Sequence, residues 1–222
     1  LRRGIALADL QAEIKNFVEK NYSIKAREIK RLPAGLMNLN YLIRTEGKSY
    51  VFRINYLRSV PDVTFTVEVL QALAAKKFPS PRLEKSNEKK FILSIKGKPC
   101  LLYKYIKGRS QLRLDKNLLW QTGFFLGRMH KILRNLKPTI IKPTWDPEGL
   151  KKIVRRNRRK MIKSKFKGAK ELMDFMEAEL KKFSFPKSLP AGITHQDVKP
   201  ENIIVNKGKI QGIVDFDNAY RG

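Results

Sequence analysis

Apolar side chains recur at two different spacings along the first half of the chain, one typical of helices and the other typical of strands. Helical spacing predicts one helix over 9–20 and a second that begins after Ser59 and ends before Pro79. Short runs rich in β-branched and aromatic residues predict strands over 29–32, 41–45, 49–54, 90–95 and 98–106. This order is typical of a small antiparallel sheet with one packed helix.

The second half of the chain is mainly helical until a hairpin near its end. Apolar periodicity predicts a helix over 118–133 and helical structure with basic faces over 150–180. Strands over 203–205 and 210–214 then flank the turn Asn206-Lys207-Gly208-Lys209. The expected fold class is therefore α+β, with the change of character near Gly108.

Three polar residues bracket this hairpin. Asp197 and Asn202 precede its first strand, and Asp215 follows its second. Because a hairpin brings its two ends together, we expect the three side chains to lie close to one another. Carboxylate and amide oxygens can hold Mg²⁺, and a carboxylate can orient a hydroxyl group, which is what phosphoryl transfer from ATP requires. The alternative interpretation is that they are ordinary turn residues with capping roles.

The spacing of these residues resembles that of the protein-kinase-like superfamily. His195, Asp197 and Asn202 match the catalytic-loop pattern H-x-D-x-x-x-x-N, and Asp215-Phe216-Asp217 is similar to the metal-binding D-F-G sequence. An acidic third residue in place of glycine is the habit of the branch that contains aminoglycoside phosphotransferases, choline kinases and type II homoserine kinases. The segment 126–130 is similar to a helix signature of the same branch, L-G-x-x-L/M-H.

The resemblance implies roles for the residues around the hairpin. Asp197 would orient or deprotonate the acceptor hydroxyl, His195 would brace the catalytic loop, and Lys199 would lie near the transferred phosphate. Asn202 and Asp215 would bind magnesium, so the implied cofactors are ATP and Mg²⁺. For the second aspartate of the D-F-D sequence, a structural hydrogen-bonding role and a ligand role both stay open.

Residues in the first half match parts of the nucleotide site of the same superfamily. Arg53 would be the cation that reaches the phosphates, and Glu68 the glutamate that pairs with it. Asn38 lies in a loop similar to the phosphate loop G-x-x-N-x-x-Y. Tyr103 and Tyr105 lie in the expected hinge, whose backbone groups would meet the edge of adenine. Taken alone, a strand arginine, a helix glutamate and a β-turn would each be ordinary features.

The fold implied by the resemblance is two-lobed. A β-rich, nucleotide-binding N-lobe would occupy residues 1–106, and a helical C-lobe with the catalytic hairpin would occupy residues 107–222. Members of this branch usually carry several more helices after the aspartate matched by Asp215, so the C-lobe is expected to be incomplete. Because those helices build much of the acceptor pocket, the sequence does not name the acceptor or the oligomeric state.

Charge and cysteine content bound the partners and the compartment. The chain has 48 Lys and Arg residues against 20 Asp and Glu residues, a net charge of +28, which attracts polyanions. The basic segment 151–160 is either a solvated helix face or a surface for weak polyanion binding. The single cysteine, Cys100, rules out an internal disulfide and fits the cytoplasm. No apolar run is long enough to cross a membrane.

The favoured interpretation is an enzyme that moves the γ-phosphate of ATP to a hydroxyl group of a small molecule. One alternative is a protein-kinase-like enzyme, which the sequence Lys199-Pro200-Glu201 and the positive charge favour. The other is a basic nucleic-acid-binding protein that has a kinase-like scaffold and no catalytic activity.

Overall fold

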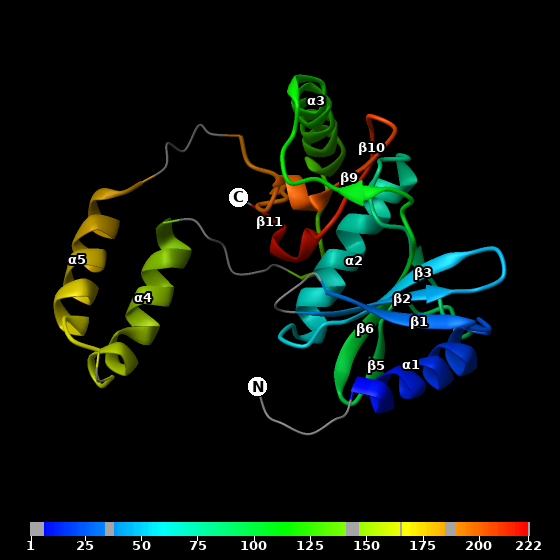
Figure 1. Cartoon of the computed structure of the whole chain (residues 1–222). Coiled ribbons are helices and arrows are strands. Elements are labelled where there is room, and N and C mark those ends of the chain that lie inside the picture. The colour runs from blue at the N-terminus through cyan, green and yellow to red at the C-terminus, as the bar shows by residue number, and fades with distance from the viewer. Residues whose placement is uncertain (1–6, 34–37, 141–146, 165, 185–189, 222) are drawn as a thin grey trace.

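The computed structural model describes residues 7–33, 38–140, 147–164, 166–184 and 190–221. Its first half is a six-stranded antiparallel sheet (Figure 1). The strand order is β1-β2-β3-β6-β4, and β5 pairs with β6 beside this path. The strands are β1 (Glu28–Leu32), β2 (Leu39–Arg44), β3 (Ser49–Ile54), β4 (Leu83–Glu84), β5 (Leu93–Ile95) and β6 (Lys98–Lys104).

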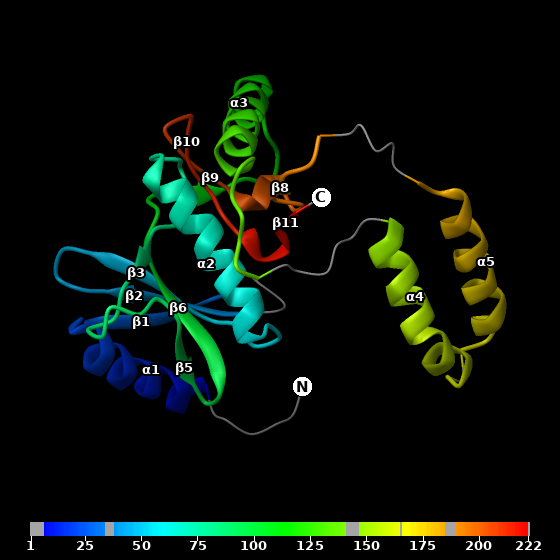
Figure 2. The ribbon, with the colours of Figure 1, turned by 180° about the vertical axis from the view of Figure 1, so that it is seen from behind.

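Helices α1 (Leu7–Tyr22) and α2 (Val60–Ala75) lie on opposite faces of this sheet (Figures 1 and 2). Phe52 of β3 points to the α1 face, where its ring lies 5.7 Å from that of Phe17. The neighbouring Val51 points to the α2 face, because side chains alternate along a strand. The sequence predicts one packed helix for this sheet, and the structure has two because the apolar stripe of α1 covers the second face. Cys100 lies buried in the α1-facing core, and burial raises its pKa to about 12.

The core on the α2 face continues into the second half of the chain. Residues of α2 share one buried cluster with α3 (Lys116–Leu133) and with the strands of the hairpin. Ser59 caps α2: its hydroxyl accepts from the Asp62 N–H, and the Asp62 carboxylate accepts from the Ser59 N–H in return. This buried core extends across residues 106 and 107. The boundary between the two lobes that the sequence places there stays a prediction.

The second half carries the hairpin and several very short elements. They are β7 (Arg109–Ser110), β8 (Ile193–Thr194), the 3₁₀ turn η1 (Pro200–Asn202), β9 (Ile203–Asn206), β10 (Lys209–Ile213), the 3₁₀ turn η2 (Phe216–Asn218) and β11 (Tyr220–Arg221). Gly108 has a φ of 151°, and a Cβ there would lie 2.6 Å from the Val205 oxygen. Glycine therefore lets the chain that leaves β6 cross closely over β9.

Two helices stand to one side of the rest of the molecule in both views (Figures 1 and 2). These are α4 (Pro147–Ile162) and α5 (Ala169–Lys182), which pack against each other. The sequence predicts helical structure through 150–180, but the helix breaks before Gly168, whose φ is 81°; residue 165 lies outside the described residues. In the described part of the chain, no helix is long and apolar enough to cross a membrane.

Candidate active site

The hairpin brings its two ends together. The Val214 N–H donates to the Asn202 carbonyl oxygen at 2.9 Å, one step beyond the β9–β10 pair Ile203–Ile213. Asp215 therefore follows directly after the residue that is hydrogen-bonded to Asn202. This places the end of β10 beside the loop that carries Asp197.

Asn202 is hydrogen-bonded to Asp197. Its Nδ2 donates to the Asp197 carbonyl oxygen at 2.8 Å and to Asp197 Oδ2 at 3.1 Å. The Lys199 Nζ lies 3.2 Å from the same Oδ2. With 25 % of its side chain exposed, the Asp197 carboxylate is fixed in direction and still reachable by a substrate.

His195 ties this loop to the end of β10. Its Nε2 donates to the Val214 oxygen at 3.0 Å, so Nδ1 is the acceptor for the Asp197 N–H at 3.3 Å. The ring is 1 % exposed and lies 4.4 Å from the Phe216 ring. Burial lowers the pKa of His195, which favours the neutral imidazole that these two hydrogen bonds need. The geometry therefore gives His195 a positioning role.

This burial makes stability depend on pH. As pH falls through about 6.5, the ordinary histidine value, the unfolded chain takes up a proton that folded His195 resists. The stability that comes from burying neutral His195 should therefore be full above that pH and decrease below it. A His195→Gln variant should lose less stability over the same pH interval. Urea unfolding at pH 7.5 and 5.5 measures the difference, and the exposed His130 is common to both proteins. Equal losses in the two proteins would contradict the assignment.

Asp215 adopts an unusual backbone conformation at the turn into η2. Its φ and ψ of 68° and 62° are left-handed, a region that aspartate tolerates better than most residues. Its side chain is 35 % exposed, and its Oδ1 lies 3.3 Å from Arg53 Nη1. The conformation thus turns a carboxylate towards a cation of the β-sheet while leaving part of it accessible.

Arg53 of β3 is the centre of a polar cluster that joins the sheet to the hairpin. Its Nη1 also lies 3.1 Å from Asp217 Oδ1, and its Nε donates to Asn40 Oδ1 at 2.9 Å. Its guanidinium carbon lies 5.9 Å from the centre of the Tyr103 ring. Burial acts against the charged form, but the Asp217 and Asp215 carboxylates outweigh it and raise the pKa of Arg53. Asn40 was not among the predicted site residues, although the β2–β3 register places it opposite Arg53.

Asn38 reaches the same cluster. Its Nδ2 donates to Asp217 Oδ2 at 2.6 Å. This contact fixes the orientation of the amide, because the reverse orientation would set an amide oxygen against a carboxylate. The amide oxygen is buried and has no hydrogen-bond partner among the described residues. The other residues that make up the start of the predicted phosphate loop, 35–37, lie outside the described residues.

The sequence predicted that Glu68 pairs with Arg53. The structure does not contain this pair. The Glu68 carboxylate accepts from the Thr139 backbone N–H at 2.9 Å and from the Thr139 hydroxyl. Arg53 is instead drawn to the two aspartates that follow β10. The prediction was wrong because position on a helix fixes a side chain's direction only roughly, and a second acidic residue competes for the cation.

The residues of the expected hinge form part of their contacts within the sheet. Tyr103 lies in β6 between β3 and β4, and its side chain contacts Arg53. The Tyr105 N–H donates to the Ser49 oxygen at 3.0 Å, and the Lys104 N–H to the Arg82 oxygen at 2.8 Å. A contact between adenine and this segment stays a prediction, and it would use backbone groups other than these N–H donors.

The residues at the hairpin ends suit magnesium. Within the described residues, no group of three or more His, Cys, Asp or Glu residues could hold a metal ion. The Asn202 Nδ2, however, donates both of its described hydrogen bonds to Asp197, and no described residue donates to the Asn202 Oδ1. That oxygen and the accessible Asp215 carboxylate are hard ligands of the kind that Mg²⁺ binds together with waters and substrate phosphates.

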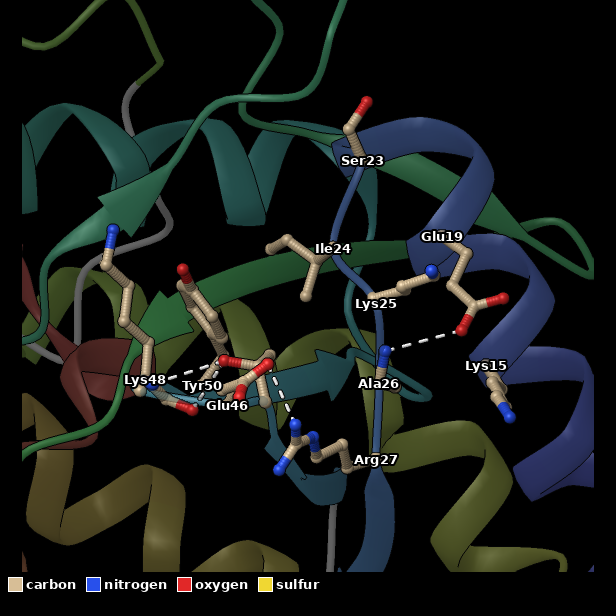
Figure 3. A pocket seen from close by; sticks show the side chains of 12 residues that line it. Lys15, Glu19, Ser23, Ile24, Lys25, Ala26, Arg27, Glu46, Lys48 and Tyr50 are labelled. Carbon is tan, nitrogen blue, oxygen red and sulfur yellow. Dashed lines mark hydrogen bonds and ion pairs between the residues drawn. The ribbon is translucent and has the colours of Figure 1, made fainter.

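A hollow lies away from these residues, between α1 and the β2–β3 turn (Figure 3). It has a volume of about 890 Å³, and none of the candidate site residues lines it. Lys15 and Lys48 extend away from each other at its two sides, and the Glu46 carboxylate is paired with Arg27 at 2.8 Å. Because its cations do not converge, this hollow is no match for a nucleotide phosphate.

Two curated relatives are homoserine kinases. The protein from Zymomonas mobilis is 29 % identical over 195 residues, which cover 85 % of this chain and 58 % of that protein. The protein from Chelativorans sp. is 25 % identical over 221 residues, which cover 94 % and 64 %. The chain therefore spans about three fifths of the length of these relatives.

Solved structures of small-molecule kinases share the fold. The amicoumacin kinase hAmiN, in complex with AMP-PNP, Ca²⁺ and Ami, matches with a TM-score of 0.70 and 18 % identity, over 98 % of this chain and 68 % of that one. A microcompartment-associated aminopropanol kinase matches with a TM-score of 0.67 and 13 % identity, over 95 % and 70 %. These likenesses show the two-lobed kinase-like fold. With residues 28–222 matched, the chain belongs to the phosphotransferase enzyme family.

Proposed function

We propose that this chain carries the nucleotide site and catalytic loop of an ATP- and Mg²⁺-dependent kinase that phosphorylates a hydroxyl group of a small molecule. The observation that carries the proposal is that Asp197, Asn202 and Asp215 lie at the joined ends of the hairpin, where Asp215 also contacts Arg53. It combines an oriented carboxylate, two oxygen-bearing side chains of the kind that could hold a metal ion, and a cation that is only 15 % exposed. Phosphoryl transfer depends on such positioning and charge neutralisation more than on covalent help from the protein.

In this mechanism Asp197 accepts the proton of the acceptor hydroxyl while the hydroxyl oxygen bonds to the γ-phosphorus of ATP. The bond from that phosphorus to the β–γ bridging oxygen breaks, and ADP leaves with the electron pair. Lys199 and Arg53 would lie near the phosphates and offset their negative charge. Asn202 and Asp215 would hold Mg²⁺, which supplies further charge neutralisation when it is bound. His195 keeps the loop in place through its bonds to Asp197 and Val214.

The acceptor proposed is an amino alcohol or a hydroxy amino acid. The named relatives are homoserine kinases, and a structural neighbour is an aminopropanol kinase. These names favour the small-molecule class over the protein kinase alternative. The test is ³¹P NMR of ATP with homoserine, aminopropanol, choline and spectinomycin in turn. A new phosphate ester that requires both ATP and Mg²⁺ supports the proposal; no ester with any of the four, together with phosphorylation of a protein substrate, would contradict it.

A further inference from the structure

Asp217 connects two nucleotide-site candidates of the sheet to the hairpin. Its Oδ1 lies 3.1 Å from Arg53 Nη1, and its Oδ2 accepts from Asn38 Nδ2 at 2.6 Å. Arg53 belongs to β3 and Asn38 precedes β2, whereas Asp217 lies in η2 after β10. Only 11 % of the Asp217 side chain is exposed, so both contacts are largely screened from water. One carboxylate thus sets the positions of a cation and an amide across the junction of the two halves.

Glu68 is not available for this task. It accepts from Thr139 and so ties α2 to the segment after α3. The counter-ion of the phosphate-reaching cation is therefore carried by the hairpin and not by α2. A consequence is that the position of Arg53 depends on how the sheet sits against the hairpin.

We propose that Asp217 is a positioning residue that holds Arg53 and Asn38 ready for the nucleotide phosphates and keeps Arg53 from competing for the metal-binding Asp215. The proposal rests on the proposed function. Arg53 Nη1 is shared between the two aspartates, at 3.1 Å from Asp217 and 3.3 Å from Asp215. If Asp217 loses its charge, the guanidinium has one carboxylate left, and Mg²⁺ must compete with it for Asp215.

The test compares Asp217→Asn with Glu68→Gln, since each change replaces a carboxylate by the amide of the same shape. Calorimetric titration with AMP-PNP should show a dissociation constant raised about 10- to 100-fold for Asp217→Asn, the usual range for groups that orient a metal site. The Mg²⁺ concentration for half-maximal binding should rise as well. Glu68→Gln should bind within about twofold of the wild type, and Asp217→Glu should recover part of the affinity.

Three outcomes separate this inference from the proposed function. If the wild type binds AMP-PNP and the Asp217→Asn variant binds it with the same affinity, the inference is overturned and the proposed function stands. So would equal losses in the Asp217→Asn and Glu68→Gln variants. No Mg²⁺-dependent nucleotide binding by the wild type would overturn both. Thermal unfolding identifies a variant that fails to fold, in which case Asp217→Glu takes its place in the comparison.

A separate observation concerns the outer face of α4. Six exposed cations follow this face at helical spacing and reach the residue after the helix: Lys152, Arg155, Arg156, Arg159, Lys160 and Lys163. They span about 16 Å at the rise of an α-helix. None of them forms an ion pair with a described residue, whereas Arg158 on the α5 side pairs with Asp174 and Glu177. A hollow of about 370 Å³ lies where this face meets the α5 side, and it is lined by Arg155, Arg158, Arg159, Ile162 and Lys163.

The structure assigns this basic face to the phosphate backbone of duplex nucleic acid. A row of unpaired cations complements a regular row of phosphates, and guanidinium groups bind phosphate oxygens in pairs. Val154 of α4 is buried, and Ile162, which is 41 % exposed, is the one large apolar side chain that the described residues of this helix expose. A single apolar side chain is too little to anchor the helix in a lipid surface. Contacts to phosphates alone give binding without sequence preference.

Salt dependence tests this second proposal. Six phosphate contacts predict a slope of log K against log salt of about −5 for a 20-base-pair DNA duplex, and replacing Arg155, Arg156 and Arg159 by Gln should make the slope shallower by about 3. The control replaces the exposed Lys25, Lys30 and Lys48 by Gln, which removes the same charge from β1, the segment before it and the β2–β3 turn. It should leave the slope almost unchanged. Equal effects of the two triple variants, or tighter binding to phosphatidylserine vesicles than to the duplex, would overturn the assignment.

Discussion

Replacing Asp197 with asparagine is expected to lower phosphoryl transfer by about 10²- to 10⁴-fold, the range usual for loss of a catalytic acid or base. The carboxylate is oriented by Asn202 and by Lys199 and is still accessible to a substrate. An amide keeps the shape of the side chain but accepts a proton far more weakly. Nucleotide binding should be almost unchanged, because the residues assigned to the phosphates and the metal are still present.

The measurement is the rate of ATP- and acceptor-dependent ADP formation, with AMP-PNP affinity measured alongside. Glu201→Gln is the matched control, because this exposed residue lies in the same loop and also loses a carboxylate. It should retain nearly wild-type turnover. An Asp197→Asn enzyme with turnover within a few-fold of the wild type would remove Asp197 from the mechanism.

Replacing Asp215 with asparagine should have the second large effect, a loss of at least about 100-fold in apparent Mg²⁺ affinity. A direct ligand should matter more than the outer groups, whose removal typically costs 10- to 100-fold. Asparagine tolerates the left-handed conformation of this position as aspartate does, so the fold should persist. The change tests the charge of the ligand and not the backbone of the turn.

A Mg²⁺ titration of turnover at saturating ATP measures this effect, with thermal unfolding as the check on folding. Asp174→Asn is the control, since Asp174 pairs with Arg158 and Lys170 in the α4–α5 pair, away from the hairpin. Its Mg²⁺ dependence should match that of the wild type. If the Asp215→Asn enzyme shows the wild-type Mg²⁺ dependence, the metal is held elsewhere.

The sequence was sufficient to predict the hairpin and most of the sheet because both depend on local signals. The turn at Gly208 and the apolar runs on either side of it define β9 and β10. Ser59 and Asp62 form the capping box with which α2 begins. That Asp197, Asn202 and Asp215 lie near one another in space then followed from hairpin geometry, in which the two ends of the strand pair meet.

What the sequence could not predict depends on contacts between distant segments. The two-residue strands β8 and β11 are defined by pairing with each other and carry no periodic pattern of their own. The partner of Arg53 is decided by which carboxylate faces it across the junction, and spacing along α2 does not encode that choice. The break between α4 and α5 had a signal in Gly168, which the continuous apolar periodicity masked.

The placement of α1 shows the same limit. Its apolar stripe predicts that it packs, but the sequence does not say on which surface. The sheet has two apolar faces because apolar residues of β3 point to both sides, with the buried Phe52 towards α1 and the partly buried Val51 towards α2. Recognising both faces would have required the strand pairing, which brings β6 from a distant part of the chain beside β3.

A crystal structure with Mn²⁺ and AMP-PNP tests the central claim most directly, because Mn²⁺ takes the same oxygen ligands as Mg²⁺ and is located by its anomalous signal. The account predicts a Mn²⁺ peak bonded to Asn202 Oδ1 and the Asp215 carboxylate, the phosphates within reach of Arg53, and Asp197 facing the γ-phosphate. A Mn²⁺ peak bonded to neither Asn202 nor Asp215, or phosphates bound on another surface, would contradict it.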